Sequence, residues 1–249
     1  AVLINHVDYR SGTLRDMENL TRQVQEFGGL AVWDLSHSAG IFPVQLNRCR
    51  VDFAVGCTYK YLNGGPGAPA YLYAASRHHA ACNQPLSGWF GHARPFDFER
   101  HFDPDSGIRR FVCGTQPILS LRALQAGLEI YQDISLQQVR EKSMALTDLF
   151  IKLLKNECAA WELEIKSPED ASQRGSQVAV SHPQGYAVMQ ALISRGVIGD
   201  FRAPNLMRFG FAPLFLSYQD IHDAVKQLKQ ILEAEEWNQE AFLQKSKVT

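Results

Sequence analysis

The stretch that decides the fold is FAVGCTYKYLNGGPG, residues 53–67. Its first part, 53–56, is apolar and too short for a helix, which is typical of a buried strand. Lys60 comes shortly after this strand, and a glycine-rich turn over 63–67 follows it. The pattern therefore predicts a lysine at the end of a buried strand, with the backbone of a tight turn beside it.

Other short apolar runs flank this stretch, and helical segments separate them. Unbroken apolar strands separated by helices indicate a parallel sheet that is buried on both faces. Ligands of such sheets bind at the carboxyl ends of the strands, where Asp34 and residues 57–60 lie. The expected strands cover 2–7, 30–33, 53–56 and 70–73, and the expected helices cover 13–27, capped by Thr13, and 44–50.

The remainder of the chain changes character. Residues 82–116 show few helical periods, so we predict a long irregular loop of the kind that is usually functional. A helical stretch is expected from Pro117 to about residue 157, with a break near Ser135. After it, strands are expected at 163–166, 178–181, 198–201 and 206–209, with helices at 183–195 and near 221–232.

These elements predict an α/β chain with two domains. Residues 1–135 are expected to form part of a large domain with a mostly parallel sheet and flanking helices. Residues 136–249 are expected to form a smaller C-terminal α+β domain. The chain opens on the apolar run 1–4 without a polar lead-in, so we also expect an upstream portion of the large domain to be missing.

Composition excludes several classes of protein. The chain has 249 residues, with 25 Lys+Arg against 26 Asp+Glu and a net charge of −1. Hydrophobic residues make up 45% and charged residues 20%, which is typical of a globular protein. This balance argues against a disordered chain and against a nucleic-acid partner. No long apolar window is free of charge, so no membrane span is expected.

The cysteine pattern also narrows the choices. Five cysteines occur at wide spacings, and none forms a CxxC pair. A disulfide framework and a zinc site are therefore not expected. We predict no metal site and a reducing, cytoplasmic compartment.

Lys60 and Asp34 carry the strongest chemical signals, and each has a plain structural alternative. A lysine at a buried strand end is partly removed from water, which favours the neutral amine that Schiff-base chemistry needs; the alternative is an ordinary surface lysine. Asp34 ends an apolar strand, where a carboxylate needs a cation or donors. The protonated nitrogen of pyridoxal phosphate is one such partner, and capping of the next segment is the alternative. His37 lies three residues further on, where a lone histidine is more often structural.

Four further residues are candidates. Tyr59 offers a phenol next to Lys60, either to a phosphate or as an acid, or else it simply packs. Arg208 is the one cation inside the apolar strand 206–209, so it must meet an anion. A bidentate grip on a substrate α-carboxylate and a structural salt bridge are both open. Trp89 and Phe90 lie in the irregular loop, where they either meet a ligand or anchor the loop.

Four segments together resemble the kynureninase family, pyridoxal-phosphate enzymes of the aminotransferase-like fold type I. The resemblance runs from His6 to the C-terminus, is densest over 33–121, and is carried by WDLSHSAG at 33–40, VGCTYKYLNGGPGAP at 55–69, GWFGH at 88–92 and GTQPILS at 114–120. It implies the second half of a large domain of the class V type, followed by a smaller C-terminal domain.

The resemblance implies a role for each matching residue around the cofactor. Lys60 matches the lysine that carries pyridoxal phosphate, and Asp34 matches the carboxylate on its pyridine nitrogen. His37 matches a neighbour of the cofactor. Tyr59 matches a tyrosine that contacts the phosphate and donates a proton, so Lys60 and Tyr59 are the implied catalytic residues. Asn5 falls where relatives have Ser or Thr near the cofactor and is counted as cofactor-binding.

Other roles concern the second subunit and the substrate. Trp89 and Thr115 match residues that reach the cofactor phosphate from the partner of a homodimer with a shared active site. Arg208 matches the arginine that binds the substrate α-carboxylate, and Gly114 and Phe90 match residues beside the substrate. The pair Gly114 and Thr115 is similar to the bacterial pairing that goes with kynurenine rather than its 3-hydroxy form.

The implied reaction is the hydrolysis of L-kynurenine to anthranilate and L-alanine in tryptophan catabolism, on the route to NAD. One alternative is another enzyme of the superfamily, a cysteine desulfurase or a class V aminotransferase. Cys113 and Cys158, however, do not lie in a motif that matches a desulfurase nucleophile. The other alternative is a non-catalytic fragment or partner subunit, because the family's phosphate-binding loop, ring-stacking aromatic residue and a further Asp all precede the strand that begins at Val2.

Overall fold

The computed structural model describes residues 1–245 and divides them into two compact units. The first unit comprises Ala1–His6, Asp16–Ala39 and Val44–Asp133. The second unit comprises Val7–Arg15, Gly40–Pro43 and the residues from Ile134 onward. The two short segments thus group with the second unit, although their place in the sequence assigned them to the first domain.

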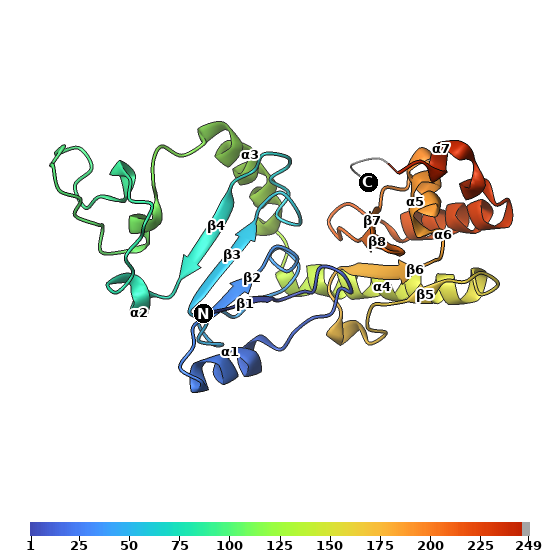
Figure 1. The fold of residues 1–249 in the computed structure, drawn as a ribbon, viewed down its shortest axis with the longest axis horizontal. Coiled ribbons are helices and arrows are strands. Elements are labelled where there is room, and N and C mark those ends of the chain that lie inside the picture. Colours follow the sequence, from blue (N-terminus) through green and yellow to red (C-terminus); the bar gives the residue numbers. More distant parts are fainter. Residues whose placement is uncertain (246–249) are drawn as a thin grey trace. The chain divides into compact units, whose positions relative to one another are not determined.

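The first unit is built on a four-stranded sheet with the strand order β1-β2-β3-β4 (Figure 1). The first three strands are parallel, and β4 is antiparallel to β3 because their connection contains turns and no crossover helix. The expected mostly parallel sheet is confirmed. The strands are β1 (Val2–Asn5), β2 (Ala31–Asp34), β3 (Phe53–Cys57) and β4 (Ala70–Ala74).

The sheet register places polar residues together at the carboxyl ends of the strands, and the buried core lies on one face of the sheet. Asn5 lies opposite Asp34, and Asp34 lies opposite Val55. Successive strand residues point to opposite faces, so Trp33 points away from the face of Asp34. The Trp33 side chain is fully buried with Met17, and its Nε1 donates to the Thr21 hydroxyl at 2.9 Å. Helix α1 therefore covers the face opposite Asp34.

The predicted start of α1 is wrong. The helix spans Met17–Glu26, and its cap is Asp16, whose carboxylate accepts from the Asn19 N–H at 3.0 Å. A carboxylate at the cap position satisfies a backbone donor that would otherwise lack a partner. Thr13 instead forms an isolated antiparallel bridge with Arg174.

The predicted helix over 44–50 is also wrong. These residues form a loop and a run of turns. The Val51 N–H donates to the Leu46 carbonyl at 3.0 Å, and Arg50 adopts a left-handed conformation with φ 52°. A left-handed residue ends helical hydrogen bonding, so the chain turns here into β3.

The rest of the first unit follows the sequence closely. Residues 82–116 contain the short 3-10 helices Trp89–Gly91 and Ile108–Phe111 and an isolated bridge between His92 and Pro104, in agreement with the predicted irregular loop. Helix α2 (Ser76–His79) precedes this loop. Helix α3 (Ile118–Glu129) begins directly after Pro117 and leads into a 3-10 turn at Ile130–Gln132.

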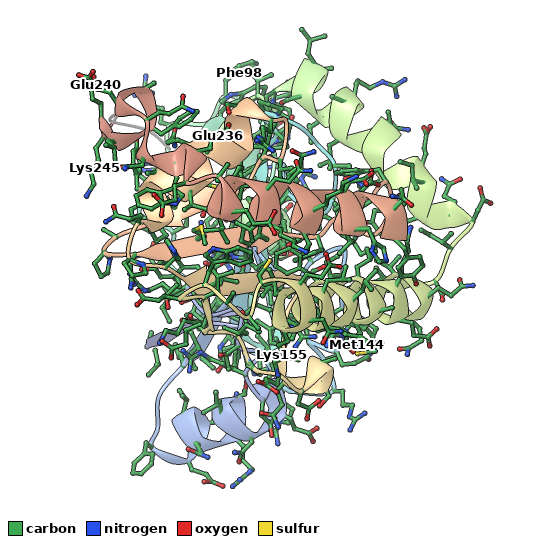
Figure 2. The ribbon with its side chains drawn as sticks, turned by 90° about the vertical axis from the view of Figure 1, so that its right-hand side faces the viewer. Phe98, Met144, Lys155, Glu236, Glu240 and Lys245 are labelled. Carbon is green, nitrogen blue, oxygen red and sulfur yellow. The ribbon has the colours of Figure 1, made fainter. Side chains whose placement is uncertain are left out.

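The second unit contains an antiparallel sheet with the order β5-β6-β8-β7. Figure 2 shows helix α4, which carries Met144 and Lys155, and α6 packs against it. The predicted break before α4 is present, since Ser135 and Gln138 form a reciprocal cap there. The elements are α4 (Leu136–Glu157), β5 (Glu164–Ile165), β6 (Gln177–Ser181), α5 (Gly185–Ser194), β7 (Asp200–Arg202), β8 (Leu206–Gly210), α6 (Tyr218–Glu233) and α7 (Glu240–Leu243).

Three features are absent from the part of the chain that the structure describes. None of its helices is both long enough and apolar enough to cross a membrane. Residues 1–245 also contain no group of three or more His, Cys, Asp or Glu side chains arranged for a metal ion. The five cysteines lie within these residues, and each is a free thiol.

Candidate functional site

Asp34 lies half-buried at the carboxyl end of β2. Among the described residues, its carboxylate accepts hydrogen bonds from neutral donors. The Asn5 Nδ2 donates to Oδ2 at 3.1 Å, and the Ser36 N–H donates to Oδ1 at 2.8 Å. Within residues 1–245, no basic side chain forms an ion pair with this carboxylate. Capping of the segment after β2, the structural alternative for Asp34, is therefore present. The two hydrogen bonds leave acceptor positions on the carboxylate that a cationic partner can use.

His6 borders the same strand end but adds no charge to it. Its backbone N–H donates to the Asp34 carbonyl at 3.0 Å, and its ring meets the Trp33 indole edge-on at 5.8 Å. Burial lowers the pKa of His6 to about 4. The imidazole is consequently neutral at pH 7 and brings no positive charge to this strand end.

Lys60 lies three residues beyond β3, in a tight turn. The Asn63 N–H donates to the Lys60 carbonyl at 3.0 Å, and the Gly64 N–H donates to the Thr58 carbonyl at 2.9 Å. The Lys60 side chain is half-buried, and its Nζ lies 5.3 Å from the centroid of the Tyr59 ring. No carboxylate among the described residues pairs with this amine.

One face of α3 and the turn after it fix the backbone around Lys60. A Cβ on Gly127 would lie only 2.8 Å from the Asn63 carbonyl oxygen, so the helix and the turn meet backbone to backbone. Leu124 contacts the same turn at Gly64, and the Tyr131 hydroxyl donates to the carbonyl of Tyr61. The roles of these anchors were missed from the sequence, although positions 124, 127 and 131 share one helical face.

Tyr59 and His37 flank this group. The Tyr59 side chain is 51% exposed. It therefore does not pack into the core, which was the alternative to a chemical role. His37 is half-buried in the turn that follows β2. Since β2 and β3 are parallel neighbours, the turns after them belong to the same edge of the sheet as Asp34 and Lys60.

The loop over 82–116 is held together by glycine contacts. A Cβ on Gly88 would lie 1.7 Å from the Cys113 carbonyl oxygen, and one on Gly91 would lie 2.8 Å from the Arg110 carbonyl oxygen. Contacts this short are available only without a side chain. The segments 88–91 and 110–113 therefore run in direct backbone contact.

This contact brings three of the expected loop residues together. Trp89 and Phe90 have ring centroids 4.2 Å apart, and the Trp89 Nε1 lies 3.9 Å from the place of a Cβ on Gly114. Trp89 is 44% exposed, and Thr115, the next residue after Gly114, is also accessible. A cavity of about 360 Å³ lies beside Trp89, lined by aromatic and charged side chains from residues 92–102.

Arg208 belongs to the second unit, on β8, and it has an ion-pair partner. Its Nε donates to the Asp200 Oδ1 at 2.6 Å, and its Nη2 donates to the Asp200 Oδ2. Its Nη1 donates to the Tyr9 carbonyl. The salt bridge foreseen as one alternative is present, but it does not use every N–H of the guanidinium.

The sheet edge of the first unit thus carries a distinctive pair of charges. Among the described residues, Asp34 is a carboxylate without a cationic partner at the last position of β2, and Lys60 is an amine without an anionic partner three residues beyond the neighbouring parallel strand β3. A ligand with both an electrophilic carbon and a cationic ring nitrogen would satisfy both groups.

Comparison with known proteins agrees with this arrangement. Residues 139–228 match the family model described as the kynureninase C-terminal domain. Curated kynureninases from Burkholderia mallei strain SAVP1 and from Pseudomonas fluorescens are 50% and 49% identical to this chain over 247 and 248 residues. These matches cover 99% and 100% of this chain, but only 59% and 60% of the relatives.

Solved structures share the fold at low identity. A cysteine desulfurase from Thermococcus onnurineus has a TM-score of 0.80 and 19% identity, and covers 94% of this chain and 60% of its own. A mutant of C-DES, with glycine covalently linked to its PLP cofactor, has a TM-score of 0.79 and 18% identity over 92% of this chain and 60% of its own. The predicted fold class is confirmed. Half of the residues of this chain are identical to those of kynureninases along nearly its whole length, residues 139–228 match the kynureninase C-terminal domain, and the chain spans about three fifths of the relatives it matches.

Proposed function

We propose that this chain forms part of a kynureninase that binds pyridoxal phosphate and hydrolyses L-kynurenine to anthranilate and L-alanine. One observation carries the proposal. Lys60 and Asp34 follow neighbouring parallel strands, and neither has a charged partner among residues 1–245. The 50% identity to kynureninases supports the choice of substrate.

The residues of the sheet edge fit the cofactor. Asp34 would accept a hydrogen bond from the protonated pyridine nitrogen, because its present donors are neutral. Lys60 would bind the aldehyde carbon, with His37 and Asn5 near the ring and Tyr59 near the phosphate. When bound, pyridoxal phosphate draws electrons from the bonds around the substrate Cα.

The chain's own groups then move protons and hold the substrate. The Asp34 carboxylate holds a proton on the ring nitrogen by its negative charge. The Lys60 amine takes the proton from the substrate Cα. Water adds to the γ-carbonyl carbon and the Cβ–Cγ bond breaks, which releases anthranilate, and the Tyr59 phenol donates a proton to Cβ. Arg208 binds the α-carboxylate through two N–H groups.

The remaining roles concern a second copy of the chain. We propose a cytoplasmic homodimer in which Trp89 and Thr115 reach the cofactor phosphate of the other subunit, while Phe90 and Gly114 lie beside the substrate ring. The exposure of Trp89, at 44%, and of Leu119 on α3, at 88%, supports a partner surface in this part of the first unit. The pair Gly114 and Thr115 favours kynurenine over its 3-hydroxy form.

A reconstitution experiment tests this function. The purified protein is mixed with pyridoxal phosphate, and the absorption spectrum and the formation of anthranilate from L-kynurenine are recorded. A new cofactor band together with turnover is expected. If neither signal appears, even after addition of the remaining two fifths of a related kynureninase, the proposal is contradicted.

The same experiment addresses the second candidate, a non-catalytic fragment or partner subunit. The coverage of 59% of the B. mallei relative favours this candidate. If it holds, the isolated chain gives no band and no turnover, and both appear only with the added polypeptide. A band and turnover from the isolated chain contradict it.

Replacement of Arg208 by lysine is expected to raise KM for L-kynurenine about tenfold, with little change in kcat. Lysine keeps the charge but presents one nitrogen instead of two coplanar ones, so the bidentate contact is lost. Steady-state kinetics measure the effect. Arg202→Lys, on the neighbouring strand β7, serves as the control, and an unchanged KM in Arg208→Lys argues against the carboxylate role.

A further inference from the structure

We propose that Asp200 is a positioning residue, which orients the Arg208 guanidinium so that two of its N–H groups face a substrate carboxylate. Asp200 does not touch the substrate in this scheme. The inference rests on the proposed function and adds to it the group that prepares the carboxylate subsite.

The sheet register explains why this acid meets this base. Strands β7 and β8 are antiparallel, and Asp200 lies directly opposite Arg208. Residues that face each other in this way place their side chains on the same face of the sheet. The two carboxylate oxygens of Asp200 accept hydrogen bonds from the Nε and the Nη2 of Arg208, and the bond from Nε is 2.6 Å long. Two parallel hydrogen bonds fix the plane of the guanidinium as well as its position.

A second fixed point holds the other side of the guanidinium. The Arg208 Nη1 donates to the Tyr9 carbonyl, and the centroid of the Tyr9 ring lies 5.9 Å from the guanidinium carbon. The Tyr9 carbonyl also accepts from the Gln177 Nε2 at 3.0 Å. Gln177 is buried on β6, the strand on the other side of β8. Arg208 is therefore held from both neighbouring parts of the second unit.

The number of remaining donors matches a carboxylate. A guanidinium has five N–H groups, and among the described residues three of those on Arg208 have acceptors. The two that remain are on different nitrogens, Nη1 and Nη2, so both terminal nitrogens keep a donor for a carboxylate. The Arg208 side chain is 11% exposed, so the site is reachable but poorly hydrated.

The charge of the cluster also suits an anion. Besides Arg208, Asp200 contacts Arg202, whose Nη2 lies 3.4 Å from the Asp200 Oδ2. One carboxylate thus faces two guanidinium groups, and the three side chains together carry one positive charge. Asp200 orients Arg208 without cancelling its attraction for a substrate anion.

The first test is kinetic. Asp200→Asn is expected to raise KM for L-kynurenine about tenfold while kcat stays within about twofold, since the subsite acts in the ground state and the transition state alike. Asp200→Glu, which keeps the charge, is expected to restore part of the affinity. Arg195→Gln, which removes a guanidinium that pairs with Glu236 instead of Asp200, is the control and leaves KM within about twofold.

The second test separates positioning from a general loss of structure. The decarboxylated analogue of kynurenine, used as a competitive inhibitor, is expected to bind Asp200→Asn and wild type equally. In an Arg208→Lys background, Asp200→Asn is expected to add no further increase in KM, because both changes remove one interaction. The proposal is overturned if Asp200→Asn loses as much affinity for the analogue as for L-kynurenine, or if the effects of Asp200→Asn and Arg208→Lys on KM are additive.

A third measurement needs no turnover. The Nε–H signal of Arg208 in nitrogen-15 NMR, identified by its loss in Arg208→Lys, is expected to be protected from exchange in wild type and Arg202→Gln and lost in Asp200→Asn. A wild-type protein that shows this signal but no turnover contradicts the proposed function only. An unprotected signal in wild type, or one that survives in Asp200→Asn, contradicts the positioning role of Asp200.

Discussion

Lys60→Ala is expected to slow the conversion of L-kynurenine by at least about 10³-fold. In the proposed mechanism, alanine removes both the amine that binds the cofactor and the base that takes the Cα proton, and a positioned base alone contributes about 10²- to 10⁴-fold. No carboxylate among the described residues pairs with Lys60, so removal of its charge leaves no buried anion behind. The loss of activity should therefore occur with an almost unchanged melting temperature.

A labelling experiment checks the identity of the lysine. The protein is loaded with pyridoxal phosphate, reduced with borohydride, digested and examined by mass spectrometry. The pyridoxyl group is expected on Lys60 in wild type and in the control Lys152→Ala, whose exposed side chain lies on α4. A label on any other lysine of wild type would contradict the assignment.

Asp52→Ala is expected to destabilise the protein by about 3–5 kcal/mol. Asp52 is 2% exposed just before β3, and its carboxylate accepts from the Ala31 N–H at 2.9 Å and the Gln25 Nε2 at 3.0 Å. It also accepts from Arg77 at 2.6 Å and contacts the His78 Nε2 at 2.7 Å. Alanine leaves these donors without an acceptor where water has little access.

The pH dependence of stability gives the measurement. Burial alone would raise the pKa of Asp52, but its hydrogen bonds outweigh burial and hold the pKa well below its usual range. A carboxyl group with a lowered folded-state pKa stabilises the fold above its unfolded pKa of about 4, and this contribution is lost as pH falls below that value. Denaturant unfolding between pH 7 and pH 3 should show a steeper loss of stability in wild type than in Asp52→Ala.

A matched control makes this result specific. Asp133→Asn changes an exposed carboxylate at the end of the first unit. We expect it to keep the wild-type pH slope and the wild-type stability at pH 7. Parallel slopes in wild type and Asp52→Ala would show that Asp52 is not the group responsible.

The strands and the candidate residues at their ends were predictable because the signal is local. An apolar run as short as 53–56 indicates a strand, and β3 forms there, although Ala54 and Gly56 are buried while Phe53 and Val55 are only half-buried, so the expected burial on both faces is incomplete. The residues that follow it, including Lys60, then lie at the edge where ligands of parallel sheets bind. No knowledge of distant contacts is needed for that inference, and the same reasoning placed Asp34.

The errors arose where contacts between residues far apart in the sequence determine the local structure. Thr13 is a good helix cap by type, but Asp16 is the cap, and Thr13 pairs with Arg174, which is far away in sequence. Asp200 was missed because its meeting with Arg208 depends on the antiparallel register of two short strands. Gly127 was missed because a glycine in a helix reveals its use only when the Asn63 carbonyl is seen beside it.

The backbone contact at Gly88 and Gly91 has a consequence for how substrate preference can change. With the segments 88–91 and 110–113 in direct contact, a shift of the backbone at Trp89 would also displace the segment that leads into Gly114. If Phe90, Gly114 and Thr115 have the proposed roles, libraries that seek a new aromatic substrate should vary these three together while Gly88 and Gly91 stay fixed. If the proposed roles hold, we expect selectivity in this loop to change by exchange of side chains on a constant backbone, not by lengthening or rerouting the chain.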